Sequence, residues 1–301
     1  MRSTSCGRLA IAAMGLCVAT GHGARAQPGG AQPGWSAVEQ ALGRPGAAQP
    51  DSVLRFSFPR SDLRVTVDGV QLRPALALGS WLAFRRVDGG AMAMGDLVLT
   101  DDEVAPVMTR LQQGGVAQTA VHNHLLRKSP RVVYMHVEAH GDPVRIAETV
   151  RAALALSHTP LGPPAPAATA APIDLDTGAV ARALGRSGRV NGGVYQVSVP
   201  RAETVREGGH VVPPAMGVAT AINFQPTGAG RAAITGDFVM TAAEVNPVIR
   251  ALRDHGIEVT ALHSHLLGEE PRLYFMHFWA NDDAVRLARG LRAALSRMAV
   301  R

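Results

Sequence analysis

The apolar positions between residues 100 and 126 first follow a helical period and then an alternating one. Four apolar residues recur at the spacing of one helix face: Val104, Val107, Met108 and Leu111. This spacing predicts an amphipathic helix with one buried side. Thr100 and Glu103 form a T-x-x-E capping box at its start, and Gly114-Gly115 marks its end. Beyond the glycines, the pattern predicts a strand over 117–126.

Further strands and a closing helix complete the pattern. A second strand is predicted over 131–139, and Asp142-Pro143 predicts the N-cap and first residue of a helix over 143–156. Before the capped helix, four runs have the composition of strands: 53–58, 63–67, 80–86 and 91–99. Aromatic residues make up only 4% of the chain, so aliphatic side chains must fill most of the core.

The sequence then repeats itself. Gly95-Asp96 recurs 141 positions later as Gly236-Asp237, and the capping box recurs as Thr241 and Glu244. The apolar positions of the second helix are Val245, Val248, Ile249 and Leu252, followed by predicted strands over 258–267 and 272–280 and a helix beginning near Asp283. A period this long makes each copy a domain rather than a solenoid unit. We predict an α+β fold of two tandem homologous domains, each a largely antiparallel sheet packed with helices, paired as an internal pseudo-dimer.

Composition places the boundaries of these domains. The two repeat domains are expected at 35–160 and 173–301. Residues 161–172, LGPPAPAATAAP, are rich in proline and alanine and predict a semi-rigid linker. Residues 27–34 predict a flexible tail.

Residues 1–26 have the features of a secretory signal peptide. Arg2 and Arg8 provide a basic start, 9–18 is a short apolar run, and Ala24-Arg25-Ala26 is an A-x-A cleavage site. The apolar run is too short to span a bilayer. We therefore expect an exported protein, periplasmic or secreted, with no transmembrane segment in the mature chain.

Cysteine and charge exclude several classes of function. Both cysteines, Cys6 and Cys17, lie in the predicted signal peptide, so the mature chain has no disulfide or thiolate chemistry. Leu16 before Cys17 is bulky where a lipoprotein site needs a small residue, which disfavours lipid anchoring. The net charge of +6 falls to +3 when the three arginines of residues 1–26 are removed. Arginines scattered among acids indicate a solvated surface rather than nucleic-acid binding.

Each repeat carries three histidines in the pattern H-x-H-x11-H. They are His122, His124 and His136 in the first repeat and His263, His265 and His277 in the second. Residues two apart on a strand point to one side. A register that opposes His136 to His124, or His277 to His265, brings the third ring to that side. Three imidazoles so placed match zinc and non-haem iron ligand sets. The alternative is that the histidines form hydrogen bonds within the sheet or lie exposed.

The residues around the histidines extend this hypothesis. The residues that alternate with the histidines are Val121 and Leu125 in the first repeat and Leu262 and Leu266 in the second. They are expected to pack against helices. Glu269 and Glu270 precede Pro271. Either carboxylate is a candidate fourth metal ligand, hydrogen-bond partner of a ligating histidine, or general base. The alternative for both is a solvated turn.

The remaining acidic residues of the repeat pattern have ordinary structural explanations. The first repeat has Lys128-Ser129 where the second has its glutamates, so the second site is favoured if only one works. Asp96 and Asp237 follow glycine; each is a candidate ligand or orienter of a nucleophile, but turn chemistry is the favoured explanation for Gly-Asp before a helix. Glu103 and Glu244 are explained by helix capping.

Three functions fit these observations. The chain is a metal-dependent hydrolase or oxidoreductase, a non-catalytic binding module of the cell envelope for a small molecule or protein, or a metal store or sensor. A divalent metal, zinc or non-haem iron, is the expected cofactor. The sequence holds no P-loop, nucleophile elbow, H-E-x-x-H or dinucleotide fingerprint, so no nucleotide or flavin is expected.

Longer motifs resemble a known family. They are MGDLVLTDDEV at 94–104, TAVHNHLL at 119–126, TGDFVMTAAEV at 235–245 and TALHSHLLGEEPRLYFMHFWANDDA at 260–284. With these motifs the chain resembles the LppY/LpqO family of bacterial exported proteins over nearly the whole mature sequence. The resemblance implies export and a two-copy architecture. It supplies no established activity and no catalytic residue.

Overall fold

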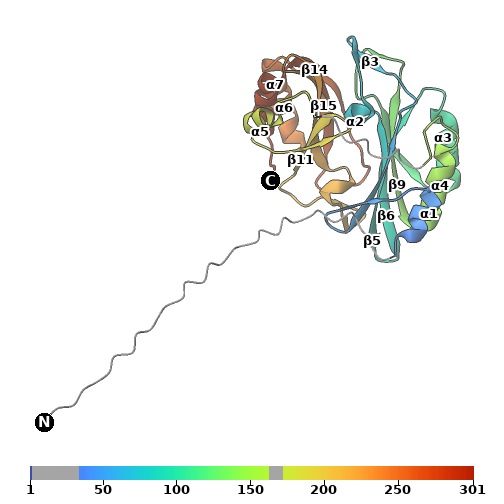
Figure 1. The fold of residues 1–301 in the computed structure, drawn as a ribbon. Coiled ribbons are helices and arrows are strands. Elements are labelled where there is room, and N and C mark those ends of the chain that lie inside the picture. Colours follow the sequence, from blue (N-terminus) through green and yellow to red (C-terminus); the bar gives the residue numbers. More distant parts are fainter. Residues whose placement is uncertain (2–33, 163–171) are drawn as a thin grey trace. The chain divides into compact units, whose positions relative to one another are not determined.

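The fold is given by a computed structural model that describes residue 1, residues 34–162 and residues 172–301 (Figure 1). The predicted signal peptide, the predicted tail up to residue 33 and the predicted linker between residues 163 and 171 lie outside the described residues. The elements below all belong to one compact unit, residues 31–301.

The two repeats contain matching series of helices and strands. The first repeat contains α1 (Ser36–Leu42), β1 (Ala47–Gln49), β2 (Val53–Pro59), β3 (Thr66–Val67), β4 (Val70–Gln71), α2 (Pro74–Ala77), β5 (Gly79–Val87), β6 (Gly90–Leu99), α3 (Val104–Gln113), β7 (Ala117–His122), β8 (Lys128–Ser129), β9 (Val133–Gly141) and α4 (Pro143–Leu154). The second repeat contains α5 (Thr177–Leu184), β10 (Arg189–Asn191), β11 (Val194–Pro200), β12 (Arg206–Glu207), β13 (His210–Val211), η1 (Pro214–Met216), β14 (Ala219–Gly228), β15 (Arg231–Met240), α6 (Ala242–Asp254), β16 (Glu258–His263), β17 (Tyr274–Asp283) and α7 (Ala284–Leu295).

Each repeat builds one six-stranded antiparallel sheet. The strand orders are β1-β2-β5-β6-β9-β7 and β10-β11-β14-β15-β17-β16, so the two sheets have the same topology. This confirms the predicted α+β class with two tandem sheet-and-helix domains. Of the predicted strands, 63–67 shortens to β3, which pairs with β4 and β8 in a separate small sheet.

Side-chain caps mark the start of several helices, directly after the preceding strand. Asp142 accepts hydrogen bonds from the backbone N–H groups of Val144 and Arg145 and caps α4, and Asp283 caps α7. The predicted capping box forms fully at Thr241, whereas the Thr100 hydroxyl donates to Asp102 instead. No helix among residues 34–162 and 172–301 is long and apolar enough to cross a membrane.

One face of each sheet packs under its own helices. In the first repeat, α1, α3 and α4 lie beside β5, β6 and β9 (Figure 1) and bury residues such as Val107 and Val150 against Met135. In the second, α5, α6 and α7 do the same over β11, β14, β15 and β17. Because side chains alternate along a strand, the next residues must project from the opposite face.

The opposite faces of the two sheets pack against each other. One apolar cluster joins Met94 of β6 to Phe275 of β17, and a second joins Val98 of β6 to Trp279 of β17. Along β6 the intervening residue on this face is Asp96, and along β17 it is His277. A polar region therefore lies between two apolar clusters at the interface of the repeats.

Polar contacts also cross this interface. The Trp279 indole N–H donates to Asp68 at 3.0 Å, and the Thr260 hydroxyl donates to the His124 carbonyl at 2.6 Å. Arg127 binds both Asp68 and Glu258. The repeats pack as an internal pseudo-dimer.

The expected packing of the residues between the histidines was wrong. Val121 and Leu262 are 45% and 47% exposed, because β7 and β16 are edge strands and these positions lie at their ends. Leu125 and Leu266 are buried, but in the two apolar clusters between the repeats rather than under helices.

Candidate metal centre

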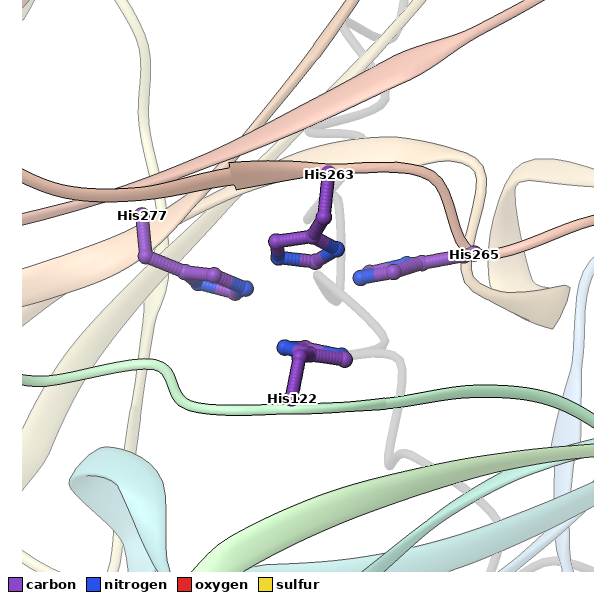
Figure 2. A group of neighbouring side chains, drawn as sticks. All are labelled: His122, His263, His265 and His277. Atoms are coloured by element: carbon purple, nitrogen blue, oxygen red, sulfur yellow. The ribbon is translucent and has the colours of Figure 1, made fainter.

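The six histidines of the two repeats meet in one cluster instead of forming two separate sites. Figure 2 shows His122 of the first repeat facing His263, His265 and His277 of the second, with ring nitrogens directed to a common space. One ligand nitrogen from each of these four lies within 4.8 Å of the others. The same holds for His122, His124 and His136.

The strand register that produces this cluster differs from the predicted one. His136 is opposite Ala120 rather than His124, and His277 is opposite Ala261 rather than His265. The prediction failed because β7 and β16 end at the first histidine of each pair, so His124 and His265 lie in the following loops. The parity argument holds, since Ala120 and His122 share a face.

A β-bulge in each of the edge strands β7 and β16 determines the face from which the first histidine of each pair projects. Gln118 is opposite Val137 and Ala120 is opposite His136, so Thr119 is an extra residue; Thr260 has the same place in β16. If Thr119 were instead paired regularly, opposite His136, His122 would lie opposite Val133 and point toward the helices, because one position of shift reverses the side of a strand. The bulge therefore directs the histidine into the interface.

The rings stack in pairs across the two repeats. His122 stacks on His263 with ring centroids 3.7 Å apart. His124 stacks on His277 at 3.7 Å and His136 on His265 at 3.6 Å. His124 corresponds to His265 in the repeat, and His136 corresponds to His277, so these last two pairs are equivalent. The cluster therefore has the pseudo-twofold symmetry of the duplication.

All six Nε2 atoms are buried and none has a hydrogen-bond partner among the described residues. A buried polar atom without a partner costs about 1–3 kcal/mol, and native proteins contain few of them. Six such atoms in one cluster form a donor set that could hold a metal ion. This excludes the alternative in which these Nε2 atoms form hydrogen bonds within the sheet.

Two carboxylates that the sequence argument had explained as turn residues belong to the same cluster. Asp96 lies within β6 opposite His136, and Asp237 lies within β15 opposite His277. The explanation by turn chemistry was wrong, because β6 and β15 continue past these residues. Alternation along β6 is a signal that could have found Asp96, since it shares a face with Met94 and Val98.

The carboxylates lie near the histidines but are too distant for hydrogen bonds. Asp96 oxygens are 3.9 Å from His124 Nε2 and 3.7 Å from His136 Nε2, and Asp237 oxygens are 3.8 Å and 4.0 Å from His265 and His277 Nε2. One oxygen of each aspartate has no partner. Two ligands of a tetrahedral zinc ion lie about 3.4 Å apart, so these separations are slightly wider than a shared ion requires.

Burial keeps the imidazoles neutral. It lowers the pKa of His122 to about 3, with help from His263, and lowers the pKa of His263 to about 4. Burial holds the pKa of the other four rings well below the usual value. The rings are therefore in the form that binds metals.

Burial acts on the carboxyls in the opposite direction. It raises the pKa of Asp96 to about 7, although Arg55 opposes the shift, and together with Asp96 it raises the pKa of Asp237 well above the usual value. Burial thus favours the neutral form of both carboxyls.

The orientation of three rings is fixed through their other nitrogen. Nδ1 of His277 lies 2.8 Å from the Gly236 carbonyl oxygen, which can only accept, so Nδ1 carries the proton and Nε2 is bare. His122 and His263 make longer contacts of the same kind with the carbonyls of Asn123 and Ser264. A backbone carbonyl on the far nitrogen is the usual arrangement for a metal-binding histidine.

Glu269 and Glu270 lie apart from this cluster. Glu269 is buried, and its carboxylate accepts from the Leu273 N–H at 2.8 Å and pairs with Arg272 at 3.2 Å. Glu270 exchanges backbone hydrogen bonds with Arg206. The carboxylates at the histidines are Asp96 and Asp237.

A small cavity adjoins the centre. It has a volume of about 20 Å³ and is lined by His136, His265, Thr119 and Phe275, among others. This is room for about one water molecule. A larger open hollow of about 500 Å³ lies between α5 and α7, but none of the six histidines lines it.

Comparisons with known proteins give little beyond the family. A comparison with curated proteins gives no match. Among solved structures, a trimeric bacterial microcompartment shell protein, PduB, matches at 14% sequence identity with a TM-score of 0.22. The match covers 83% of this chain and 90% of that one. At this TM-score the likeness carries no inference.

The comparison with protein families matches the chain twice, once in each repeat. The matched residues are 36–156 and 178–297, which together span most of the chain and agree with the tandem repeat. The chain therefore belongs to the family described as "Domain of Unknown Function (DUF1259)".

Proposed function

We propose that this chain is an exported metal-binding protein whose single centre is shared by its two repeats. One observation carries the proposal: six imidazole Nε2 atoms and two carboxylate oxygens are buried together without partners. A divalent cation satisfies neutral nitrogen and carboxylate acceptors at the same time. Its charge would also favour the ionised form of both carboxyls, against the effect of burial.

The donor set favours zinc or iron. Imidazole binds zinc, copper, iron and nickel, whereas calcium and magnesium prefer oxygen ligands. Histidines combined with a carboxylate occur in catalytic zinc sites and in non-haem iron sites. The aspartates replace Glu269 and Glu270 in the ligand set that we propose.

We further propose that the centre is catalytic. A structural zinc site is closed by four protein ligands, whereas a catalytic site keeps a position for water. The cavity of about 20 Å³ beside His136 and His265 provides that position. A metal ion there would lower the pKa of bound water and supply a nucleophile. A closed shell would instead favour the non-catalytic alternatives, an envelope binding module or a metal store.

The first experiment measures metal content. Mature protein is purified after expression in medium containing zinc and iron and is analysed by elemental mass spectrometry. We expect bound metal in the wild type and at least a ten-fold loss in His265→Ala and His277→Ala. His255→Ala is the matched control, because His255 is exposed directly after the end of α6 and its Nδ1 contacts the Ala251 carbonyl. Equal, near-zero metal in all four proteins would contradict the proposal.

A second experiment tests the open position. Cobalt(II) replaces the native ion, and azide is added while the visible spectrum is recorded. An open position predicts a saturable spectral change, while a closed shell predicts none. The second result would remove the catalytic part of the proposal and leave metal binding in place.

Export and the finer family assignment are part of the same proposal. The features of residues 1–26 support cleavage after Ala26, and the motifs around the histidines support a relationship to the LppY/LpqO proteins. N-terminal sequencing of the protein recovered from the periplasm or medium tests the cleavage. Recovery of the intact chain from the cytoplasm alone would contradict export.

A further inference from the structure

The histidines of each repeat form a roughly flat layer. In the first repeat the His122 ring is inclined by 12° to His136 and by 31° to His124. In the second repeat the His263 ring is inclined by 19° to His277 and by 32° to His265. Each repeat thus contributes three nearly parallel rings whose Nε2 atoms are unpartnered.

The two layers lie face to face. Each ring of one layer faces one ring of the other at a centroid distance of 3.6–3.7 Å, which is about one stacking distance. Two metal ions that act together in enzymes lie about 3.5–4 Å apart. An ion held in each layer would therefore have the spacing of a two-metal site.

Each layer also has its own carboxylate. Asp96 lies 3.7–3.9 Å from His136 and His124 of the first layer, and Asp237 lies 3.8–4.0 Å from His265 and His277 of the second. Resting on the proposed function, we propose that the centre holds two ions. The first is bound by His122, His124, His136 and Asp96, and the second by His263, His265, His277 and Asp237.

A single ion accounts for less of the structure. The four-histidine group shown in Figure 2 could hold one ion. That arrangement leaves Nε2 of His124 and His136 and Oδ1 of Asp96 buried without partners. Two ions give a partner to every unpartnered atom of the six histidines and two aspartates, and they follow the symmetry of the repeat.

The pair of ions also specifies the chemistry. Each ion would already have four protein ligands, so water would bind only as a fifth ligand. The adjoining cavity of about 20 Å³ has room for about one water molecule and is lined by one histidine of each layer, His136 and His265. A water held there by both ions would be the nucleophile that two-metal sites activate.

The experiment counts ions. Purified full-length mature protein, stripped and reconstituted with zinc, is analysed for zinc per chain, and X-ray absorption at the zinc edge measures the metal–metal distance. We expect two ions per chain and a metal–metal distance of about 3.5–4 Å. One ion per chain would overturn this inference and leave the proposed function intact. No ion would contradict both.

Variants show which residues hold each ion. His124→Gln and His136→Gln change only the first layer, and we expect each to retain one zinc per chain. The matched change in the second layer, His265→Gln, should also leave one zinc, whereas His255→Gln should leave two. Two zinc ions in His124→Gln and His136→Gln would overturn the assignment. Circular dichroism of each variant identifies any loss of fold.

Discussion

Asp96 illustrates how the environment of a single side chain defines a function. It lies on a strand that is buried on both faces, between Met94 and Val98, where a carboxylate is costly unless it is paired. Arg55 is the cation that acts on it, and Arg55 is itself bonded to the Ala215 carbonyl. The proposed metal ion would account for the presence of this acid, and of Asp237, in the interior.

The aspartates should therefore control metal affinity, and Glu269 should not. We expect Asp96→Asn and Asp237→Asn each to weaken zinc binding roughly ten- to hundred-fold, because the change removes a ligand charge. Glu269→Gln should stay within about two-fold of the wild type. Competition with a chromophoric chelator measures the affinities. An effect confined to Glu269→Gln would restore the prediction made from the sequence.

Glu103 has a structural role that is visible in its pH dependence. Although burial favours its neutral form, hydrogen bonds from Arg60 and from the backbone N–H groups of His158 and Thr100 lower the pKa of Glu103 to about 2. Arg60 and Glu103 are both buried, and their ion pair has an equivalent in Arg201 and Glu244 of the second repeat.

A lowered carboxyl pKa stabilises the fold at neutral pH. The contribution is complete above the unfolded value near pH 4.5 and is lost as the pH falls toward 2. We expect Glu103→Gln to lower the free energy of unfolding at pH 7 by roughly 3 kcal/mol, because Arg60 loses a buried partner. Urea unfolding between pH 3 and 7 measures this. Glu148→Gln, on the exposed side of α4, is the control and should change little.

At the scale of elements, the centre depends on two edge strands with equivalent bulges. The extra residue, Thr119 in β7 or Thr260 in β16, reverses the side from which the following histidine projects. Neighbouring strands then supply the remaining ligands: β9 and β17 carry the third histidine, and β6 and β15 carry the aspartate. Strand pairing thus brings together residues up to 40 positions apart within each repeat.

A shift of one residue in β7 should remove the ligand. Insertion of one alanine between Ala120 and Val121 moves His122 from its place opposite Tyr134 to the helix side of the sheet, so we expect zinc bound to the first layer to be lost. Deletion of Thr119 removes the bulge but keeps His122 opposite Tyr134 and should retain the metal, as should Thr119→Ala. Zinc per chain and circular dichroism are the measurements. Unchanged zinc in the insertion variant would show that the register of β7 does not orient the histidine.

At the scale of the molecule, packing of the two repeats has produced a six-histidine cluster that neither repeat has alone. Two apolar clusters flank the centre. The polar contacts around the interface have diverged: Arg127 joins Asp68 and Glu258 on one side, and its equivalent in the second repeat is Gly268. The centre has stayed symmetric while its surroundings have changed.

Because the two proposed ions would lie face to face at the interface of the repeats, their removal should destabilise the whole chain. Metal at about 100 times its dissociation constant stabilises a protein by roughly 2.7 kcal/mol. For a chain of this size that corresponds to roughly 5–10 °C in melting temperature. Scanning calorimetry with and without a chelator measures the shift. Two separate unfolding transitions, or a melting temperature that the chelator does not change, would show that the ions do not link the repeats.

The sequence by itself determined the local elements and the repeat. The helical period at Val104–Leu111, the caps at Asp142 and Asp283, and the strand-like runs at 80–86 and 91–99 all lie in the predicted elements, because local spacing and capping chemistry act over a few residues. The 141-residue offset predicted two equal domains, and the histidine pattern predicted a shared face in each.

Only the tertiary structure decided how these parts meet. The bulges at Thr119 and Thr260 depend on pairing with β9 and β17, and no local pattern shows them. Asp96 resembled a turn residue until β6 was seen to be buried on both faces. The merging of two histidine sets into one centre follows from packing two sheets face to face, because burial of apolar surface between distant segments is set by the whole fold.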